Sequence, residues 1–534
     1  MKPENKIPLV IGVTGHIDLR EEDGDALLAA VCLEMEKLRN RFPCTPLKMI
    51  SGLAAGADLL CADAAEKLNI PLTAVLPFPA EEYRQDFSAA DWTRVTHHLA
   101  RAETVYTVTP AEAEPESADR DFFCRQVEIH IAEHCHILIA LWDGQEDNAL
   151  GCGNSGTLRF ALNGEWIPLR GMALRSGENS AVIHIMTPGS PDHSSQAGAV
   201  RYLGSWQMME DVLKSTEEFN RLAEKAELEE NSLLSSLKES QLPHLPTLDA
   251  LYRTADTLSL RFARQYRRTL KSLAALATLL TFAFLLYDNG EMIPMILLCG
   301  AALGCSFLCC RQAARTVCHK RYLEFRTLAE ALRVQFFLRC AGSGIEVQRC
   351  MTWSQQRETG WVLLAVSAVN AGNWSVAPRD ISVCWVRGQE TYHHLAEKKA
   401  SDRVARNERI LDIAGKCSIL LYAAVLCYEL LCGGLIFSPS FSLRDPESIR
   451  TLLKIVLGTI SAGTLFIAEY YGKLNLRRER DDHRKMESFF RKVSSQMSFR
   501  GQDENLLEIL AREELSENGN WCSYRRDNAP ELNL

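Results

Sequence analysis

Four apolar segments in the C-terminal half constrain this chain more than any other feature of its sequence. They run over residues 270–287, 292–310, 418–437 and 455–471. Each approaches the ~20 apolar residues that are needed to cross a hydrocarbon core of ~30 Å. The mean hydropathy of the whole chain is −0.11, so these segments are a minority of its mass. We therefore predict an all-α membrane domain with four transmembrane helices in two hairpins, behind a soluble N-terminal half.

Basic residues lie at the start of the first segment and after the second segment of each apolar pair. They include Arg267, Arg268, Lys271, Arg311, Arg315, Lys416, Lys473 and Arg477. The loop at 288–291 between the first two segments has no basic residue, whereas Arg444, Arg450 and Lys454 near the second loop weaken the signal without reversing it. Since basic residues favour the cytoplasmic side, we expect a multi-pass protein of a cell membrane with its soluble parts in the cytoplasm. The alternative is that the apolar segments are buried helices of a large soluble domain.

Residues 7–190 alternate short apolar runs with amphipathic stretches. The expected strands are residues 7–13, 47–50, 72–76, 104–108, 137–141 and 182–186. Such alternation predicts an α/β Rossmann-like domain with a parallel sheet covered on both faces. In such sheets the ligand lies beyond the carboxyl ends of the strands. The formal net charge of −9 gives no sign of a nucleic-acid partner.

Three loops at the expected strand ends carry small residues. Small residues let the backbone approach a ligand closely, and the N–H groups at a helix start suit a phosphate. The residues that we expect to bind a ligand are Thr14, Gly15, His16, Ser51, Gly52, Ala55, Gly56, Ala57, Asp58, Asp143, Gly153, Asn154, Ser155, Gly156 and Thr157. The alternative is that the glycines only make tight turns. The 18 cysteines include no C-x-x-C pair, so no metal site is expected.

The same loops carry a family resemblance. The stretches SGLAAGAD (51–58), LIALWDG (138–144) and GNSGT (153–157) resemble the SLOG superfamily, which takes in the DNA-processing A proteins and the Lonely Guy phosphoribohydrolases. LPFPAEEYRQDF (76–87) is similar to the bacterial defence members. The resemblance covers about residues 5–190. It implies a nucleotide-derived ligand, such as a cyclic nucleotide or an ADP-ribose derivative, and no other cofactor.

One position departs from the hydrolases of this family. Their P-G-G-x-G-T-x-x-E loop ends in a glutamate that takes part in cleaving an N-glycosidic bond, and the matching position here is Phe160. A phenyl ring can neither take a proton nor stabilise a positive charge that develops on a sugar. We therefore expect binding without a catalytic residue. Asp58, Asp143 and Glu128 remain as alternative carboxylates.

The C-terminal half carries a second resemblance. The stretch YLEFRTLAEALR (322–333), the Arg/Tyr-rich entry to the first apolar segment and the ENGNW tail (517–521) resemble the SLATT membrane effectors of bacterial conflict systems. The resemblance covers about residues 248–525. It implies a homo-oligomer in the inner membrane of a bacterium that forms a pore or disrupts the bilayer. A separate enzyme would make the nucleotide second messenger.

The sequence thus divides into three expected regions: a sensor domain at 1–205, a helical connector at 206–247 and a membrane domain at 248–534. We expect the charged connector to be a solvated spacer helix. The residues that could line a pore are Glu429, Thr459, Ser461 and Thr464, because polar groups inside a span are functional candidates. Gly300 and Gly304 form a G-x-x-x-G that would allow close helix packing.

Two functions follow from these expectations, and a membrane scaffold whose N-terminal domain binds no ligand is a third alternative. The first is an antiphage effector that senses a nucleotide second messenger and opens a membrane pore. The second is a membrane-anchored hydrolase of a nucleotide or NAD-like N-glycosidic bond, which Phe160 disfavours. His393 and His394 are neighbours on an expected helix and point about 100° apart, so we expect packing or polar contacts there and no metal chelate.

Overall fold

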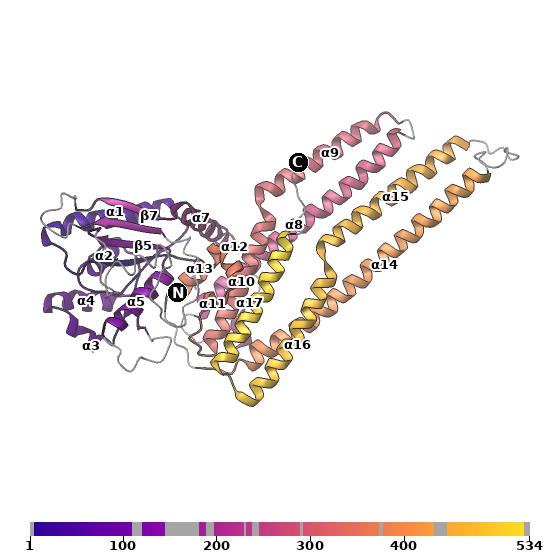
Figure 1. The fold of residues 1–534 in the computed structure, drawn as a ribbon. Helices are drawn as coiled ribbons and strands as arrows, with labels where there is room; N and C mark the ends of the chain where they lie inside the picture. Colours follow the sequence, from indigo (N-terminus) through magenta and orange to yellow (C-terminus); the bar gives the residue numbers. More distant parts are fainter. Residues whose placement is uncertain are drawn as a thin grey trace. The chain divides into compact units, whose positions relative to one another are not determined.

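The computed structural model describes residues 5–108, 120–144, 181–187, 197–228, 231–237, 245–288, 292–372, 378–431 and 446–527. The chain forms two compact units, each assembled from separate stretches of sequence (Figure 1). The first unit contains Met1–Leu258, Arg326–Asp380 and Asp503–Gly519. The second unit contains Ser259–Phe325, Ile381–Gln502 and Asn520–Leu534. The first unit therefore takes in more of the chain than the expected sensor domain.

The first unit is built on a seven-stranded sheet in the order β4-β3-β2-β1-β5-β6-β7. The strands are β1 (Leu9–Gly15), β2 (Leu47–Ser51), β3 (Leu72–Leu76), β4 (Thr104–Thr107), β5 (Ile137–Trp142), β6 (Ala181–Met186) and β7 (Val200–Gly204). All neighbouring strands are parallel except β6 and β7, which are antiparallel. The predicted α/β Rossmann-like parallel sheet is confirmed, and its antiparallel edge strand β7 was not expected.

Helices cover both faces of this sheet. They are α1 (Gly24–Arg41), α2 (Ala57–Lys67), α3 (Ala80–Tyr83), α4 (Ala89–Arg101), α5 (Arg120–His134) and α7 (Trp206–Ala223). A Cβ on Gly12 of β1 would meet Ile131 and Cys135 beside α5, whereas a Cβ on Gly15 would meet Ala57 of α2. Because side chains alternate between the two faces of a strand, α5 and α2 lie on opposite faces.

Helix α7 is part of the first unit, so the expectation of a solvated spacer at 206–223 was wrong. Its apolar face is buried and includes Met209, Leu213 and Phe219. The buried side chain of Asn220 accepts from the backbone N–H of Ile7 at 2.8 Å and donates to the carbonyl of Ile7 at 2.9 Å. The charged residues of α7 occupy only its other face, as in an amphipathic helix that packs on a core.

The rest of the described chain is helical. The helices are α8 (Leu245–Asp288), α9 (Met295–Thr316), α10 (Cys318–Cys340), α11 (Val347–Cys350), α12 (Trp353–Glu358), α13 (Gly360–Asn370), α14 (Gly388–Leu431), α15 (Pro446–Leu474), α16 (Leu476–Arg500) and α17 (Glu504–Asp527). Among them α13 is buried along its whole length and packs against α5 and α7 in the first unit. A short helix that is apolar on all sides is typical of a protein core.

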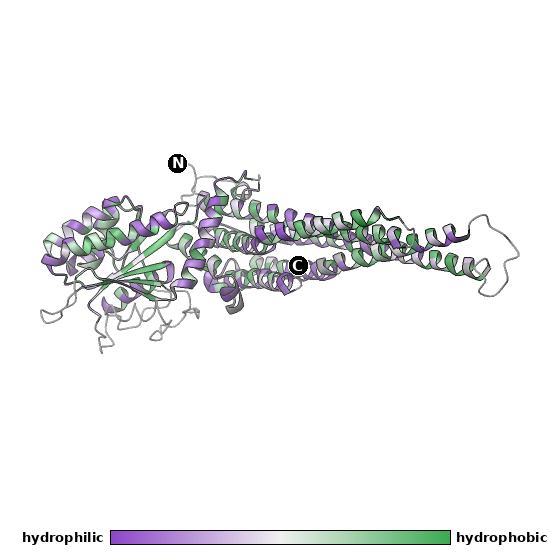
Figure 2. Ribbon diagram, turned by 90° about the horizontal axis from the view of Figure 1, so that it is seen from above, coloured by the Kyte–Doolittle hydropathy of each residue, from purple (hydrophilic) through white to green (hydrophobic). Residues whose placement is uncertain are grey.

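Four of these helices are long and apolar enough to cross a membrane. Their most apolar windows lie in Leu245–Asp288, Met295–Cys340, Ser382–Tyr428 and Glu447–Glu469, and at most 17% of each window is buried. Figure 2 shows apolar residues concentrated along the C-terminal parts of α8 and α14 and along α9 and α15. Exposed apolar side chains in this number are typical of helices that cross a hydrocarbon core. The length and composition of these helices thus indicate a membrane protein.

Glycines on two helices of the second unit have different surroundings. Among the described residues of this chain, a Cβ added at Gly300 or Gly304 would meet no atom within 4 Å, so close packing of the G-x-x-x-G against a helix of another subunit stays a prediction. A Cβ at Gly458 of α15 would instead lie 2.7 Å from Leu285 of α8. Gly458 thus lets α15 and α8 approach each other closely.

Helices α14 and α16 lie side by side in the second unit (Figure 1). Nδ1 of His393 lies 3.1 Å from Nδ1 of His483, and its ring stacks on Phe490. His394 lies 3.3 Å from Glu487. The expectation that His393 and His394 make packing and polar contacts is confirmed.

Candidate functional site

The order of the strands places the topological switch point of the sheet between β1 and β5. From β1 the chain adds β2, β3 and β4 on one side, and it then returns to place β5 on the other side of β1. In open α/β sheets the ligand binds in the crevice at this switch point, outside the carboxyl ends of the strands.

His16 and Asp143 meet across this switch point. His16 follows β1, Asp143 follows β5, and the backbone N–H of His16 donates to the carbonyl of Leu141 at 3.0 Å. The backbone N–H of Asp143 donates to Nε2 of His16 at 3.3 Å. Oδ1 of Asp143 lies 3.4 Å from the same nitrogen. Both side chains are partly exposed, so a bound ligand can reach an imidazole and a carboxylate together.

The buried side chain of Asp58 fixes the conformation of the loop between β2 and α2 by accepting hydrogen bonds from it. Ser51 donates to its carboxylate at 2.8 Å, and the N–H groups of Gly52, Leu53 and Ala54 hydrogen-bond to it as well. Burial raises the pKa of Asp58 to about 6, although these hydrogen bonds act in the opposite direction. Ser51 and Asp58, which the sequence suggested as ligand contacts, hold the loop in shape.

Two glycines let this loop pack directly against the end of β1. Gly56 has a φ of +72°, and a Cβ there would lie 2.4 Å from the carbonyl oxygens of His16 and Ile17. A Cβ on Gly15 would lie 2.5 Å from Cβ of Ala57. The N–H of Ala57 donates to the carbonyl of His16 at 2.9 Å. The start of α2 is thereby fixed beside His16.

The structure thus brings together five of the predicted ligand contacts, namely Gly15, His16, Gly56, Ala57 and Asp143. Ala55 is half-buried beside them, whereas Thr14 and Gly52 are buried. The loop 153–157, with Gly153, Asn154, Ser155, Gly156 and Thr157, lies outside the described residues, as does Phe160. Glu128 lies on α5 and is partly buried. The start of a helix with small residues around it favours an anion such as a phosphate.

The residues predicted to line a pore lie on two helices of the second unit. The hydroxyl of Thr459 donates to the carbonyl of Ile455 and that of Thr464 to the carbonyl of Ile460, both at 2.8 Å. Threonine in a membrane helix commonly satisfies its hydroxyl in this way. Ser461 is exposed on the same helix, and Glu429 belongs to α14, with its side chain outside the described residues.

A buried ionic cluster in the first unit was missed by the sequence analysis. Nε2 of His134 on α5 lies 3.0 Å from Oε1 of Glu346, which directly precedes α11. Arg349 donates to Glu133 at 2.8 Å and also lies 3.7 Å from Glu346. The available signal was Glu133-His134 at the end of α5, next to the apolar residues Ile131 and Ala132. Its partner is more than 200 residues away, and only the fold reveals it.

This cluster predicts a defined pH window of stability. Burial alone would lower the pKa of His134, but the charge and hydrogen bond of Glu346 raise it above 6.5. Burial alone would raise the pKa of Glu346, but His134 lowers it below 4.5. Stability from the pair is therefore lost as pH falls below about 4.5, and again as pH rises through the raised pKa of His134.

We expect the thermal midpoint of the detergent-solubilised protein to be highest within this pH window and to decrease at lower and at higher pH. Replacing His134 with glutamine should remove the loss at the alkaline side, because the imidazole that titrates there is gone. Thermal unfolding of both proteins between pH 4 and pH 9 measures this. An alkaline decline that is the same in the two proteins would contradict the assignment to His134.

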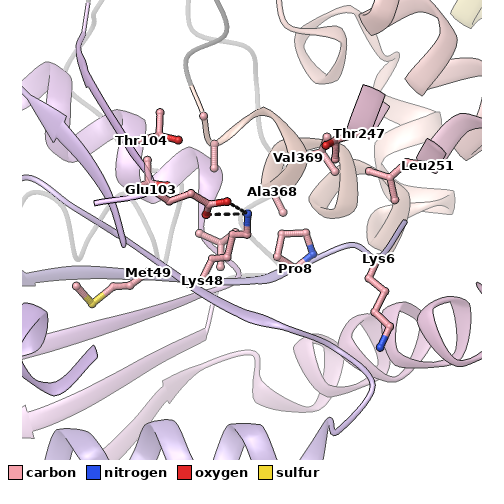
Figure 3. A pocket seen from close by; sticks show the side chains of 14 residues that line it. Lys6, Pro8, Lys48, Met49, Glu103, Thr104, Thr247, Leu251, Ala368 and Val369 are labelled. Atoms are coloured by element: carbon pink, nitrogen blue, oxygen red, sulfur yellow. Dashed lines mark hydrogen bonds and ion pairs between the residues drawn. The ribbon is translucent and has the colours of Figure 1, made fainter. Parts of the chain in front are cut away.

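A cavity of about 90 Å³ lies at the opposite, amino-terminal edge of the sheet. Figure 3 shows Lys48 and Glu103 joined across it, and their side chains approach within 3.0 Å. Thr247, Leu251 and Ala368 complete its wall. Because both of its lysines, Lys6 and Lys48, are paired with glutamates and it lies away from the switch point, this cavity is a poor candidate for a phosphate ligand.

Comparison with known proteins adds no assignment. A scan against protein-family models found no match, and a search of curated proteins found no significant relative. The resemblances to the SLOG and SLATT groups therefore stay predictions that rest on short stretches of the sequence.

Proposed function

We propose that this chain is a membrane receptor for a nucleotide-derived ligand. The observation that carries the proposal is the switch point, where the start of α2 and the pair His16 and Asp143 converge. The described part of the same chain has four helices long and apolar enough to cross a membrane. The positive end of the helix dipole at the start of α2 suits a phosphate, and the small residues Gly15 and Gly56 let a ligand approach the backbone closely. The imidazole and the carboxylate offer hydrogen bonds to a ribose or a base.

The proposed output is a change in the membrane helices. In a bacterium this would be an antiphage effector at the inner membrane, in which a homo-oligomer opens a pore or disrupts the bilayer after a separate enzyme has made the messenger. The resemblance of the C-terminal half to SLATT effectors supports this output. A ligand drives such a change only if it binds the open or oligomeric form more tightly than the resting form.

A second candidate function is cleavage of an N-glycosidic bond. The observation that favours it is the contact of 3.4 Å between Nε2 of His16 and Oδ1 of Asp143 at the expected ligand position. A carboxylate at this position can stabilise positive charge on a sugar or orient a water molecule. Turnover of the ligand therefore separates the two candidates.

The test uses the full-length protein, because the first unit includes Arg326–Asp380 and Asp503–Gly519 and a fragment of residues 1–205 would lack both segments. The protein is incubated in detergent with a panel of cyclic dinucleotides, ADP-ribose and other nucleotides. Thermal shift and product formation are both scored, and dye leakage is measured in liposomes. Stabilisation and leakage without turnover would support the receptor.

Replacing Ala55 with glutamate should weaken binding of a phosphorylated ligand about 100-fold. A carboxylate ~6 Å from a phosphate costs about 3 kcal/mol at an effective dielectric constant of ~20. Ala55→Gln has nearly the same shape without the charge and serves as the matched control. Isothermal titration with the stabilising nucleotide measures both. Equal affinities of the two variants would place the phosphate elsewhere, and base or ribose phosphate released by the wild type would support the hydrolase.

A further inference from the structure

Two helices on one face of the first unit bring histidines and carboxylates together. Oε2 of Glu66, on α2, lies 2.9 Å from Nε2 of His97 and 3.7 Å from Nδ1 of His98, both on α4. One atom from each of these three residues lies within 4.8 Å of the others. Neighbouring histidines on a helix point apart, but here both reach one carboxylate oxygen that comes from the facing helix.

The hydrogen bond of His98 to Asp63 determines which nitrogen faces this oxygen. Nε2 of His98 lies 2.8 Å from Oδ1 of Asp63, and only 3% of the His98 side chain is exposed. A carboxylate at this distance keeps the proton on Nε2 and leaves the lone pair on Nδ1. Metal-binding histidines in proteins are oriented by just such an outer carboxylate, which also raises the basicity of the ligand nitrogen.

We propose that Glu66, His97 and His98 bind a divalent transition metal ion, with Zn²⁺ as the best fit. Two imidazole nitrogens and one carboxylate oxygen are a typical Zn²⁺ ligand set, and Zn²⁺ needs them about 3.4 Å apart around bonds of ~2.0–2.1 Å. His97 is about half exposed, so a small rotation of its side chain closes the remaining distance. The fourth coordination position faces solvent, as in sites that accept water or a partner's side chain.

Arginines compete for the same carboxylates. Nε of Arg101 lies 3.0 Å from Oε1 of Glu66, and Arg94 lies 2.5 Å from Oδ2 of Asp63. In both cases the arginine takes the oxygen that the histidines do not use. The side chain of Arg101 is 60% exposed and can swing into solvent. By contrast, the buried cluster of Glu133, His134 and Glu346 holds Arg349 in place of a metal ion.

A bound ion would clamp α2 to α4. Since α2 begins at Ala57, the clamp would hold the helix whose start lies beside His16 at the switch point between β1 and β5. The site nevertheless stands apart from nucleotide binding, because none of its ligands lies at the switch point. Its test therefore succeeds or fails independently of the proposed function.

The experiment uses the full-length protein in detergent after removal of metal with a chelator. Co²⁺ is titrated first, because its visible absorption reports tetrahedral coordination, and Zn²⁺ is then used to displace it in competition with a chromophoric chelator. We expect one site per chain that binds Zn²⁺. His97→Gln keeps a hydrogen-bond donor near the position of Nε2, but glutamine is a poor Zn²⁺ ligand. This variant should weaken Zn²⁺ binding at least ~10-fold.

Two further variants separate a metal site from a network of ion pairs. Asp63→Asn should weaken Zn²⁺ binding ~10–100-fold, because the outer carboxylate is lost. Arg101→Gln should strengthen binding, because a competing cation is removed from Glu66. The proposal is overturned if the wild type and His97→Gln bind Zn²⁺ equally, or if Arg101→Gln weakens binding. Circular dichroism confirms that each variant is folded.

Discussion

Replacing Glu346 with glutamine should lower the free energy of unfolding of the first unit by about 3–5 kcal/mol. The substitution removes the negative charge that faces His134, Arg349 and the buried Arg339. Breaking a buried ionic cluster by removing one partner leaves uncompensated charges in a low-dielectric interior, and this costs about 3–5 kcal/mol. Hydrogen exchange of the amides in α5 and β1, measured on the detergent-solubilised protein, gives the change in opening free energy.

The matched control is Glu224→Gln, in which the lost carboxylate pairs with Lys6 at the surface. A pair exposed to solvent contributes little, so this variant should exchange like the wild type. The effect of Glu346→Gln should also extend to α5, because His134 belongs to that helix. If Glu346→Gln leaves the protection of α5 unchanged, the cluster does not connect α11 to α5 as described.

Replacing Gly56 with alanine should destabilise the first unit by about 2–6 kcal/mol. The backbone of Gly56 has φ +72° and ψ −111°, a conformation that L-residues rarely adopt, and its strain costs about 1–3 kcal/mol. The new Cβ would lie 2.4 Å from two carbonyl oxygens, and relieving such an overlap costs a further ~1–3 kcal/mol. Urea unfolding followed by tryptophan fluorescence measures the loss.

Gly24 provides the control for this substitution. It begins α1 with a helical φ of −54°, and a Cβ there would meet no atom within 4 Å. Gly24→Ala should leave stability unchanged or raise it by up to about 1 kcal/mol, because alanine loses less backbone entropy in a helix. Similar losses in the two alanine variants would contradict the close contact of Gly56 with His16. A residue larger than glycine at position 56 is therefore a poor probe of ligand binding, because the loss of stability would itself lower binding.

The parallel sheet could be predicted because its strands are nearly continuous apolar runs. Strand β3, for example, is buried at all five positions, as expected for a parallel strand covered on both faces. Strand β7 was missed because Val200–Gly204 is short, and most of its residues are exposed. Helix α7 was misread as solvated because its charges hide an apolar stripe at helical spacing.

The candidate site could be predicted only in part. Small residues after β1 and β2 and the aspartate after β5 were visible in the sequence, and the topology places Gly15, Gly56 and Asp143 at one switch point. The sequence could not show that Asp58 would turn inward to hold its own loop. The direction of a polar side chain depends on which backbone N–H groups surround it, and these come from the folded loop.

By itself the sequence determined the membrane character of the second unit and the α/β class of the first, because apolar length and periodicity are local properties of the chain. Only the tertiary structure decided that the first unit is completed by residues 326–380 and 503–519, and that Glu346 faces His134. The same is true of Glu66, His97 and His98, which come from helices separated by a strand. Contacts between distant segments depend on how the helices pack around the sheet, and no local pattern of residues encodes that packing on its own.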